Sequence, residues 1–382
     1  MANIDPDQSP RPQGLIWIRR RIFVASAAVM AQVQKDERGA AAVRALPGRH
    51  AVSVAYRTKL GRMLEGRVED AFDHSSLRRL RGKVNLIFTS PPFPLVTKKR
   101  YGNKSGDEYL DWLRTLAPLL GDLLTPDGSI VLELGNAWVE GSPVMSTLPL
   151  EALLAFKKAG QFHLCQHIIC HNPARLPSPA QWVNVKRARL KDAYTHVWWM
   201  ARTKEPQADN RKVLLPYSND MKSLLRTQHY NAGRRPSGHV ISESGFLTDH
   251  GGSIAANVVE GEAVEQRIPR SLLRFSGTRW DANYRQYCLD HDLEIHPARM
   301  QMPLAAFFIQ FLTKRRAMVV DPFAGSNTTG SAAEMLGRRW LSIEVNSKYV
   351  KGSKGRFARF NRAYSTSRSQ IIDSASRLGG PG

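Results

Sequence analysis

The sequence predicts an α/β fold in which a doubly wound, mostly parallel sheet carries helices on both faces. From Tyr56 onward, short apolar runs of strand length alternate with segments whose apolar residues recur at helical spacing. This alternation favours a parallel sheet, because each crossover connection lays a helix on one of its faces. The chain has 382 residues, of which 42% are hydrophobic, and it can bury a large core in one domain or two.

The elements of the first half begin with a strand at residues 84–89, which Pro91 and Pro92 end because proline offers no N–H to a sheet. A helix at 107–124 has leucines at helical spacing, and a Thr-Pro-Asp-Gly turn at 125–128 leads into the next strand. The remaining elements are a strand at 129–134, a helix at 148–159 stopped by Gly160, and strands at 162–170 and 193–201.

The periodicity fails between residues 173 and 297, where Gly, Ser, Asn and Arg are frequent. It returns as a helix at 303–312, a strand at 317–320, a helix at 328–336 and a strand at 340–344. The predicted organisation is a basic extension at 1–55, a fold in two halves at 56–203 and 295–350 around an inserted irregular region at 204–294, and a basic flexible tail at 351–382.

The charge balance favours a polyanionic partner such as nucleic acid, because 55 Lys and Arg against 33 Asp and Glu give a net charge of +22. Three arginines at 19–21 precede an apolar run that has the outline of a signal peptide. The run is shorter than the ~20 residues that a bilayer requires, and we expect a variable extension rather than export. Cys165, Cys170 and Cys288 form no disulfide framework, which fits a reducing cytosol.

The first candidate motif is Ser90-Pro91-Pro92-Phe93, directly after the strand at 84–89. In an open α/β sheet, ligands bind at the carboxyl ends of the strands. A rigid turn there holds a hydroxyl, prolyl carbonyls and an aromatic face in fixed relation. Such a set is suited to a flat ring that bears an amino group, although an ordinary strand-ending turn would show the same letters.

The second motif is a βαβ unit at residues 318–344, in which a strand ends in Asp321, a Gly-containing loop follows, and a second strand ends in Glu344. Small residues let the backbone approach a ligand, and an acid at the end of a strand suits ribose hydroxyls. The loop FAGSNTT matches neither GxGxxG nor GxxxxGK[ST], so a dinucleotide or a nucleoside triphosphate is disfavoured.

Together the two motifs resemble the amino-methyltransferases of DNA, with an FxGxxxT loop and an SPP[YF] turn. Because the catalytic motif precedes the cofactor motif, the order is similar to that of their circularly permuted β group. The chain resembles in particular the PvuII-type N4-cytosine methyltransferases. The shared strings include TSPPF, PDGS, NPARLPSP, KDAYTHVWW, RPSGH, HPAR and DPFAGSNTTG, and they extend over about residues 56–350.

This resemblance implies a Rossmann-like methyltransferase fold that binds S-adenosylmethionine and flips a cytosine out of double-stranded DNA. It implies that Ser90 and the Pro91 carbonyl accept hydrogen bonds from the N4 amino group, that Pro92 stiffens the turn, and that Phe93 stacks on the base. The methyl group would then pass directly to nitrogen, a reaction that depends on proximity and orientation.

For the cofactor, the resemblance implies one residue group at the methionine end, one acid at the ribose and a third group on the opposite wall. The first group is Asp321, Phe323, Gly325, Ser326 and Thr328, the ribose acid is Glu344, and the opposite wall is His296 and Arg299. The Gly-Asp pair of many relatives is absent, since Arg67 follows Gly66. We take Asp70, rather than Glu69, as the acid on the adenine side.

Contacts with DNA are expected from two sets of cations. Lys98, Lys99 and Arg100 lie beside the catalytic turn and suit phosphates. Within 204–294, taken as the target-recognition region, Arg234, Arg235 and His239 have donors for phosphates or guanine edges, although the same string could instead support the fold. The run Lys186, Arg187, Arg189 and Lys191 is left open between a solvated face and a DNA contact.

Two clusters are interpreted as structural. His163, Cys165 and His167 alternate on a predicted strand, but no second ligand pair has the spacing of a structural zinc site, and no metal is expected. Trp198 and Trp199 should point to opposite faces of a strand and lie in the core.

The predicted function is N4-cytosine DNA methylation in a restriction-modification or orphan modification system of a prokaryote. We expect a cytoplasmic, nucleoid-associated monomer, with a cognate restriction endonuclease as a functional partner. Three alternatives stay open: an N6-adenine methyltransferase, whose members more often have Asp or Asn where this chain has Ser90; a DNA-binding protein without catalysis; and a secreted or membrane-surface protein. The recognition sequence stays open as well.

Overall fold

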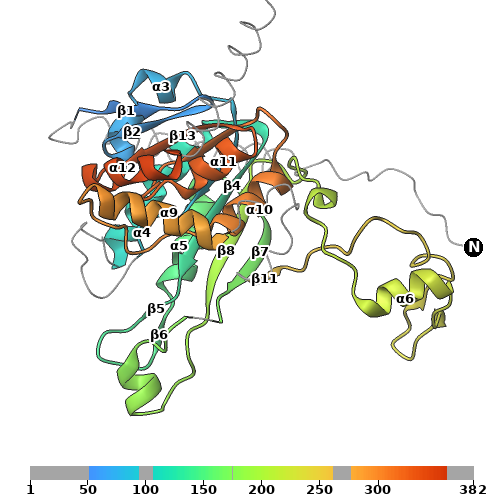
Figure 1. Ribbon diagram of the computed structural model, residues 1–382. Helices are drawn as coiled ribbons and strands as arrows, with labels where there is room; N and C mark the ends of the chain where they lie inside the picture. The colour runs from blue at the N-terminus through green and yellow to red at the C-terminus, as the bar shows by residue number, and fades with distance from the viewer. Residues whose placement is uncertain (1–50, 94–105, 174, 261–276, 359–382) are drawn as a thin grey trace, which may run out of the picture. The chain divides into compact units, whose positions relative to one another are not determined.

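The computed structural model describes residues 51–93, 106–173, 175–260 and 277–358, and a nine-stranded sheet runs through this part of the chain (Figure 1). The strands of the sheet are β1 (Ser53–Arg57), β2 (Gly61–Glu65), β3 (Val84–Thr89), β4 (Leu124–Gly135), β7 (His163–His171), β8 (Tyr194–Ala201), β11 (Val258–Glu260), β12 (Met318–Asp321) and β13 (Arg339–Glu344). Two short hairpins are β5 (Ala137–Trp138) with β6 (Met145–Ser146) and β9 (Gly233–Arg234) with β10 (Val240–Ile241).

The α-helices are α2 (Val68–Ala71), α3 (Ser75–Arg78), α4 (Gly106–Gly121), α5 (Leu148–Ala159), α6 (Asn219–Thr227), α9 (Gly277–Asp290), α10 (Met302–Leu312), α11 (Thr328–Met335) and α12 (Ser347–Ser353). Single turns of other helix types lie at Gln181–Val185, Asn210–Val213 and Lys354–Arg356. Among the described residues, no helix is long and apolar enough to cross a membrane.

The sheet has the order β1-β2-β13-β12-β3-β4-β8-β7-β11. Its centre, from β2 to β4, is parallel throughout, whereas β1 pairs antiparallel with β2, and β8 pairs antiparallel with both β4 and β7. The prediction of a mostly parallel sheet is confirmed. Strand β3, which precedes the first motif, lies beside β12, which belongs to the second motif, although more than 200 residues separate them in the sequence.

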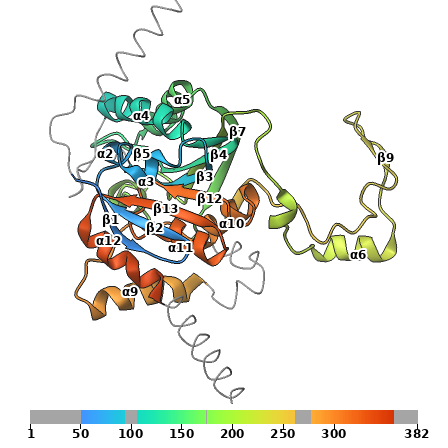
Figure 2. The ribbon, with the colours of Figure 1, turned by 90° about the horizontal axis from the view of Figure 1, so that it is seen from above.

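Two cores cover the two faces of the sheet, as the view in Figure 2 shows, with α4 and α5 on one side and α10 and α11 on the other. Alternation along β3 divides its side chains between them: Ile87 packs with α4, whereas Leu86 and Phe88 pack with α10. Trp198 and Trp199 of β8 likewise enter opposite cores, as predicted.

The predicted end of the helix at 107–124 and the predicted start of the strand at 129–134 are wrong, because the intervening turn is part of strand β4. Helix α4 ends at Gly121, three residues before the predicted end, because Leu124 already pairs with Val84 of β3. The Thr-Pro-Asp-Gly segment at 125–128 is an irregularity within β4, since the register with β3 shifts between Val84 and Leu86. The turn residues bulge out of a continuous strand and do not separate a helix from a strand.

The fold also extends beyond its predicted ends. Strand β1 begins at Ser53, inside the predicted N-terminal extension. The tail was expected to be flexible from residue 351, but α12 continues to Ser353, and Arg356 and Phe357 are 2% and 3% exposed. Phe357 stacks on Trp340 of β13 with ring centroids 5.1 Å apart, which holds this segment against the sheet.

The His-Cys-His alternation on β7 does not persist in the structure. The register between β7 and β8 shifts between Leu164 and Gln166, so Cys165 sits at a bulge and the side-chain alternation is interrupted. His167 Nε2 instead lies 2.9 Å from His196 Nδ1 of β8. In the described part of the chain, no group of three His, Cys, Asp or Glu side chains is placed to hold a metal ion.

Candidate active site at the carboxyl edge of the sheet

The two motifs meet because their strands are neighbours. Leu86 and Ile87 of β3 pair in parallel with Val319 and Val320 of β12, so both strands end at the same edge. The turn that starts at Ser90 and the loop that follows Asp321 therefore emerge side by side.

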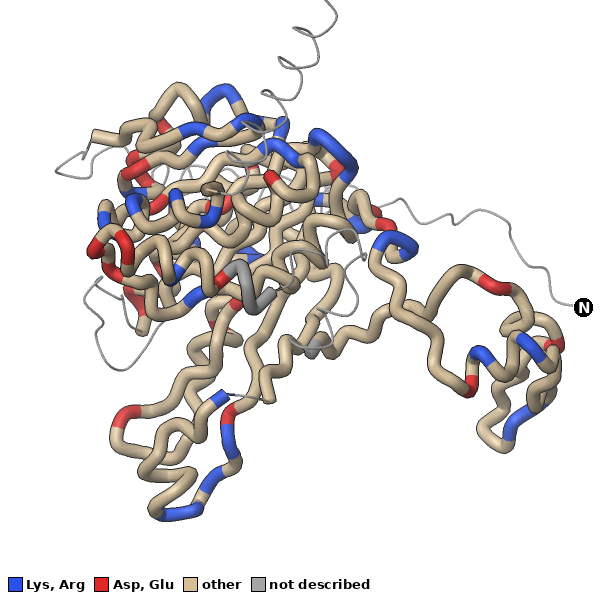
Figure 3. The backbone as a smooth tube through the Cα atoms, in the orientation of Figure 1, with Lys and Arg blue, Asp and Glu red and all other residues tan. Residues whose placement is uncertain are grey.

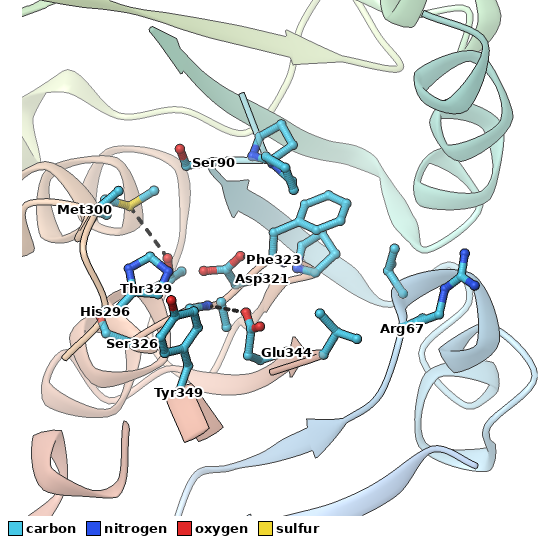
Figure 4. Close-up of a pocket in the computed structure, with 18 of the residues that line it drawn as sticks. Arg67, Ser90, His296, Met300, Asp321, Phe323, Ser326, Thr329, Glu344 and Tyr349 are labelled. Carbon is cyan, nitrogen blue, oxygen red and sulfur yellow. Dashed lines mark hydrogen bonds between the residues drawn. The ribbon is translucent and has the colours of Figure 1, made fainter. Parts of the chain in front are cut away.

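A cavity of about 380 Å³ lies between them (Figure 4). This volume lies within the ~300 to 1,000 Å³ that is typical of small-molecule sites. Of the residues predicted for the site, the cavity is lined by Ser90, Pro91, Pro92, Phe93, His296, Asp321, Phe323, Gly325, Ser326, Thr328 and Glu344. The structure thus brings both motifs and His296 to one cavity.

Glu344, at the end of β13, holds the loop that follows Asp321. Its Oε2 accepts a hydrogen bond from the Gly325 N–H at 2.8 Å, and its Oε1 accepts one from the Asn346 N–H at 2.8 Å. Burial raises the pKa of this carboxyl, and the two backbone donors oppose that rise. Each oxygen retains acceptor capacity on the cavity side, which suits a pair of hydroxyl groups.

Asp321 is 3% exposed and receives two hydrogen bonds on Oδ1, from Thr89 Oγ1 at 2.6 Å and from the Phe323 N–H at 3.1 Å. Burial nevertheless raises the pKa of this carboxyl to about 6. A cation placed in the cavity would favour the ionised form, so Asp321 is suited to a positively charged ligand group.

Gly325 is the one position of the loop where a side chain cannot fit. Its φ is +50°, and a Cβ there would lie 2.7 Å from His296 Nε2. His296 in turn meets the edge of Tyr349, with ring centroids 4.5 Å apart. Glycine therefore lets the loop pass beneath the imidazole and close one wall of the cavity.

The loop is fixed from behind by two buried polar side chains. Asn327, with φ +59°, caps α11 by accepting from the Gly330 N–H, accepts from Ser342 Oγ at 2.7 Å, and donates to the Tyr56 hydroxyl at 2.9 Å. Arg356 donates to the Ser326 carbonyl at 2.8 Å and to Ser326 Oγ at 2.9 Å. The loop geometry is thus set before any ligand arrives.

Asp70 does not line the cavity, whereas its neighbour Glu69 does. Both residues lie on α2, whose first two residues, Val68 and Glu69, line the cavity, whereas Asp70 lies further along the helix and outside the lining. Glu69 Oε1 accepts a hydrogen bond from Trp112 Nε1 at 2.7 Å, and Arg67 Nε lies 3.5 Å from Oε2. The acid that faces the cavity is therefore Glu69, and the expectation for Asp70 is corrected.

Arg299 also lies outside the cavity lining. Its Nε pairs with Asp281 Oδ2 of α9 at 2.9 Å, and its Nη1 donates to the His296 carbonyl at 2.8 Å. The guanidinium positions the backbone of His296, and the prediction of a direct cofactor contact is corrected to this supporting contact.

Three of the predicted DNA contacts lie in the described part of the chain, outside the cavity lining. Arg234, Arg235 and His239 belong to the β9–β10 hairpin, where the Arg235 N–H donates to the His239 carbonyl at 2.7 Å, and they do not line the cavity. Lys98, Lys99 and Arg100 lie outside the described residues.

Several cavity residues escaped sequence reasoning. Trp112 of α4 packs against Phe323 with ring centroids 5.4 Å apart, and Tyr349 of α12 and Met300 complete the lining. In the sequence, Trp112 belongs to a predicted helix, and helical spacing alone does not tell whether its side chain faces a cavity or the hydrophobic core. Tyr349 lies within the predicted half at 295–350 but after its last predicted strand at 340–344, where no further element was expected.

The lining combines an acid for a cationic group, an acid for hydroxyls, and aromatic faces at Trp112 and Phe323. Such a set fits an elongated ligand that carries positive charge at one end, a sugar in the middle and a planar ring. The residues present therefore fit an adenosyl cofactor such as S-adenosylmethionine.

Comparison with known proteins gives four findings, of which the first three concern the sequence. Residues 84–355 match the model of a family described as DNA methylase, N6_N4_Mtase. The chain is 40% identical over 276 residues to the type II methyltransferase M.PvuII of Proteus hauseri. This match covers 72% of this chain and 78% of that protein. It is 29% identical over 150 residues to the DNA adenine methyltransferase YhdJ of Escherichia coli (strain K12), covering 37% of this chain and 50% of that protein.

Among solved structures, the PvuII DNA methyltransferase (cytosine-N4-specific) superposes with a TM-score of 0.60 and 32% identity. The match covers 80% of this chain and 88% of that one.

Proposed function

The chain belongs to the DNA methylase family, and we propose that it transfers a methyl group from S-adenosylmethionine to the exocyclic N4 of cytosine in double-stranded DNA. The observation that carries the proposal is the position of Ser90-Pro91-Pro92-Phe93 on the same cavity as Asp321 and Glu344. The 40% identity to M.PvuII, whose solved structure is titled cytosine-N4-specific, favours cytosine N4 over adenine N6.

The cofactor would be held by the acids and aromatic faces of the cavity. Asp321 would face the positive groups of its methionine part, Glu344 would accept hydrogen bonds from the ribose hydroxyls, and Glu69 would lie toward the adenine; all three residues line the cavity. Bound S-adenosylmethionine supplies an electrophilic methyl group on a sulfonium. Phe323 and Trp112 exclude water from this part of the cavity, which strengthens the attraction between charges within it.

The catalytic turn orients the amino group that receives the methyl. Ser90 Oγ and the Pro91 carbonyl accept its two hydrogens, which directs the nitrogen lone pair away from the turn and toward the cofactor pocket. Pro91 and Pro92 contribute no backbone donor that could compete for these acceptors. Phe93 lines the cavity and packs against Gly135 of β4, where a Cβ would lie 2.8 Å from its ring, and in this proposal it stacks on the target base.

The target base must leave the helix, because its amino nitrogen is out of reach inside the stack. Residues 204–294 form the target-recognition region in this proposal, with Arg234, Arg235 and His239 as candidate contacts. The proposal also includes a cognate restriction endonuclease as a functional partner, a monomeric state, and a cytoplasmic, nucleoid-associated location.

The test uses the full chain, DNA of mixed sequence and methyl-labelled S-adenosylmethionine. The DNA is digested to nucleosides, and the labelled species is identified by mass. We expect N4-methylcytosine, and we expect the label to disappear in Ser90→Ala. Ser75→Ala on α3, an exposed serine at the opposite edge of the sheet, is the matched control and should keep full activity.

Label on N6-methyladenine would keep the fold and the cofactor but overturn the base assignment. Binding of S-adenosylmethionine without any labelled DNA would favour a DNA-binding protein that has lost catalysis. Equal activity of Ser90→Ala and the wild type would remove the catalytic turn from the mechanism.

A further inference from the structure

An arm of the molecule that belongs to neither candidate DNA-contact set extends from the sheet. It consists of the hairpin β5–β6 at residues 136–147 together with residues 172–173 and 175–193, which include the single helical turn Gln181–Val185 (Figure 1). We call these residues the basic arm.

The basic arm is joined to the sheet at the edge where the active site lies. It leaves from the carboxyl end of β4 at Gly135 and from the carboxyl end of β7 at His171, and it returns at Tyr194. Gly135 itself is in contact with Phe93 of the catalytic turn. Whatever the arm binds is therefore presented on the side of the molecule that the target base must approach.

The basic arm carries five cations and two acids, Glu140 and Asp192, and its cations are concentrated in one segment. From Asn172 to Lys191 the sequence holds five cations and no acid, and the cations are Arg175, Lys186, Arg187, Arg189 and Lys191. Asp192 at the base of the arm is already engaged, because it accepts from Asn136 Nδ2 at 2.7 Å and lies 3.5 Å from Arg175 Nη1. Figure 3 shows the Lys and Arg positions in blue along the end of the arm that is remote from the sheet.

The basic arm is built as a defined structure rather than a loose loop. The Arg189 guanidinium lies over the Trp138 ring, 2.9 Å from its centroid, and joins the two segments of the arm. Lys186 Nζ lies 4.7 Å above the Trp182 ring, and the Ala188 N–H donates to the Trp182 carbonyl at 2.8 Å. These contacts hold Arg187 and Lys186 at the surface, where both are exposed.

Exposed apolar side chains accompany the cations. Leu190 is 90% exposed between Arg189 and Lys191, and Val185 is 77% exposed beside Lys186. Single exposed leucines are ordinary, but cations that alternate with exposed aliphatic side chains match the surface of duplex DNA. The cations can pair with phosphates, and the aliphatic side chains can contact sugars and base edges in a groove.

We propose that the basic arm binds the duplex beside the flipped base, with Lys186 and Arg187 on phosphates and Leu190 against the groove. This inference rests on the proposed function, since it takes DNA as the substrate. It assigns a role to a cation run that the sequence left undecided, and it places a second DNA-binding surface at the catalytic edge, in addition to the target-recognition region.

The test compares two pairs of substitutions in the full chain. Lys186→Ala with Arg187→Ala removes two cations from the basic arm. Arg78→Ala with Arg79→Ala removes two equally exposed, adjacent cations that precede the amino end of β3, at the opposite edge of the sheet. Binding to a labelled mixed-sequence duplex is measured by fluorescence anisotropy over a series of salt concentrations.

For the arm pair, we expect at least about a tenfold loss of affinity near 0.1 M salt and a salt slope smaller by about 2, because each lost phosphate contact removes about 0.9. The control pair should keep the wild-type slope. In the methylation assay, the arm pair should raise KM for DNA, while kcat at saturating DNA and the affinity for S-adenosylmethionine stay unchanged.

A second pair tests the aliphatic contact. Leu190→Glu should weaken binding by at least about tenfold, because it removes the aliphatic contact with the groove and places a negative charge between the two phosphate backbones. Leu154→Glu, at an exposed leucine of α5 that is 64% accessible, should leave binding unchanged. Thermal melting of all variants checks that the fold is intact.

Equal losses in the arm pair and the control pair would overturn the inference, because the contribution would then be net charge alone. Failure of the proposed function gives a different result. If the wild type binds DNA through the arm but transfers no methyl group, the inference stands and the enzymatic assignment falls.

Discussion

Thr89 Oγ1 donates a hydrogen bond of 2.6 Å to Asp321 Oδ1, which joins the last residue of β3 to the last residue of β12. The catalytic turn follows one of these residues, and the cofactor loop follows the other. The bond is buried, so it couples the positions of the two motifs without competition from water.

Replacing Thr89 by Val keeps the shape of the side chain but removes the donor. The hydrogen bond favours the ionised carboxylate, so its loss should raise the pKa of Asp321 further above its ordinary range. Hydrogen bonds to charged groups contribute about 1.5 to 3 kcal/mol, and we expect the affinity for S-adenosylmethionine at pH 7 to fall by about tenfold or more. Calorimetric titration measures this affinity, and Thr115→Val on the exposed side of α4 is the control. If Thr89→Val bound S-adenosylmethionine as tightly as the wild type, the hydrogen bond between the two motifs would contribute nothing to cofactor binding.

The pH dependence of cofactor binding should follow Asp321. Burial raises the pKa of this carboxyl from 3.8 to about 6, so below pH 6 the free protein holds a proton that a cationic cofactor must displace. Affinity should therefore be constant above pH 7 and about tenfold weaker at pH 5. The unfolded chain loses this proton near pH 4, so the same group lowers the stability of the free protein as pH rises from about 4 to 6. Asp321→Asn should bind weakly at every pH; a profile that keeps its slope in this variant would assign the titration to another group.

Gly325→Ala should be harmful for two separable reasons. A φ of +50° costs a residue with a Cβ about 1 kcal/mol or more, and the new Cβ would lie 2.7 Å from His296 Nε2. We expect the affinity for the cofactor to fall by about tenfold or more. In the double variant with His296→Ala, the loss of affinity that comes from the clash with the imidazole should disappear, whereas the loss that comes from the positive φ should remain. Losses that simply add would show that the imidazole is not the obstacle.

Glu344→Gln tests the ribose acid. The carboxylate accepts two backbone N–H groups, from Gly325 and Asn346, and an amide has only one oxygen with which to replace it. One donor is left facing an NH₂ group, and the loop should shift. We expect the affinity for S-adenosylmethionine to fall by about 10- to 100-fold. Glu151→Gln at the start of α5 is a control that should change nothing; unaltered binding in Glu344→Gln would argue against the ribose contact.

The sequence predicted those parts of the fold that depend on local pattern. Helix α5 begins and ends at the predicted residues because its apolar spacing and Gly160 agree. Trp198 and Trp199 enter opposite cores because alternation along a central strand leaves no other choice. The sequence placed both motifs at the ends of strands, but only the sheet order reveals that these two strands, β3 and β12, are neighbours.

What the sequence could not give depends on contacts between distant segments. The choice between Glu69 and Asp70 is decided by the direction in which α2 packs, and no pattern in four residues encodes it. Arg299 was expected on the cavity wall because the family resemblance implies it there together with His296, but its guanidinium pairs with Asp281 of a helix that was not predicted. The basic composition of the tail suggested solvent, and only the fold reveals that one of its arginines is buried.

Arg356 is that residue, and it is the last prediction. Its guanidinium donates to the Ser326 carbonyl and hydroxyl and lies 3.1 Å from Asp281 Oδ1, and burial lowers its pKa. Arg356→Met should remove the donor that the structure gives to the buried Ser326 carbonyl and leave Ser326 Oγ with only Thr328 Oγ1 at 3.4 Å, and an unsatisfied buried group costs about 1 to 3 kcal/mol. Arg356→Lys should not restore both hydrogen bonds, because an ammonium lacks the planar fork that serves both at once.

We therefore expect both Arg356 variants to lower the free energy of unfolding in urea and to weaken the binding of S-adenosylmethionine. Lys354→Met, two residues earlier and exposed, removes the same charge without touching the loop and is the matched control. If the control were as damaging as Arg356→Met, the effect would come from the charge of the segment. If Arg356→Met lost stability but bound the cofactor normally, the arginine would support the fold without setting the loop.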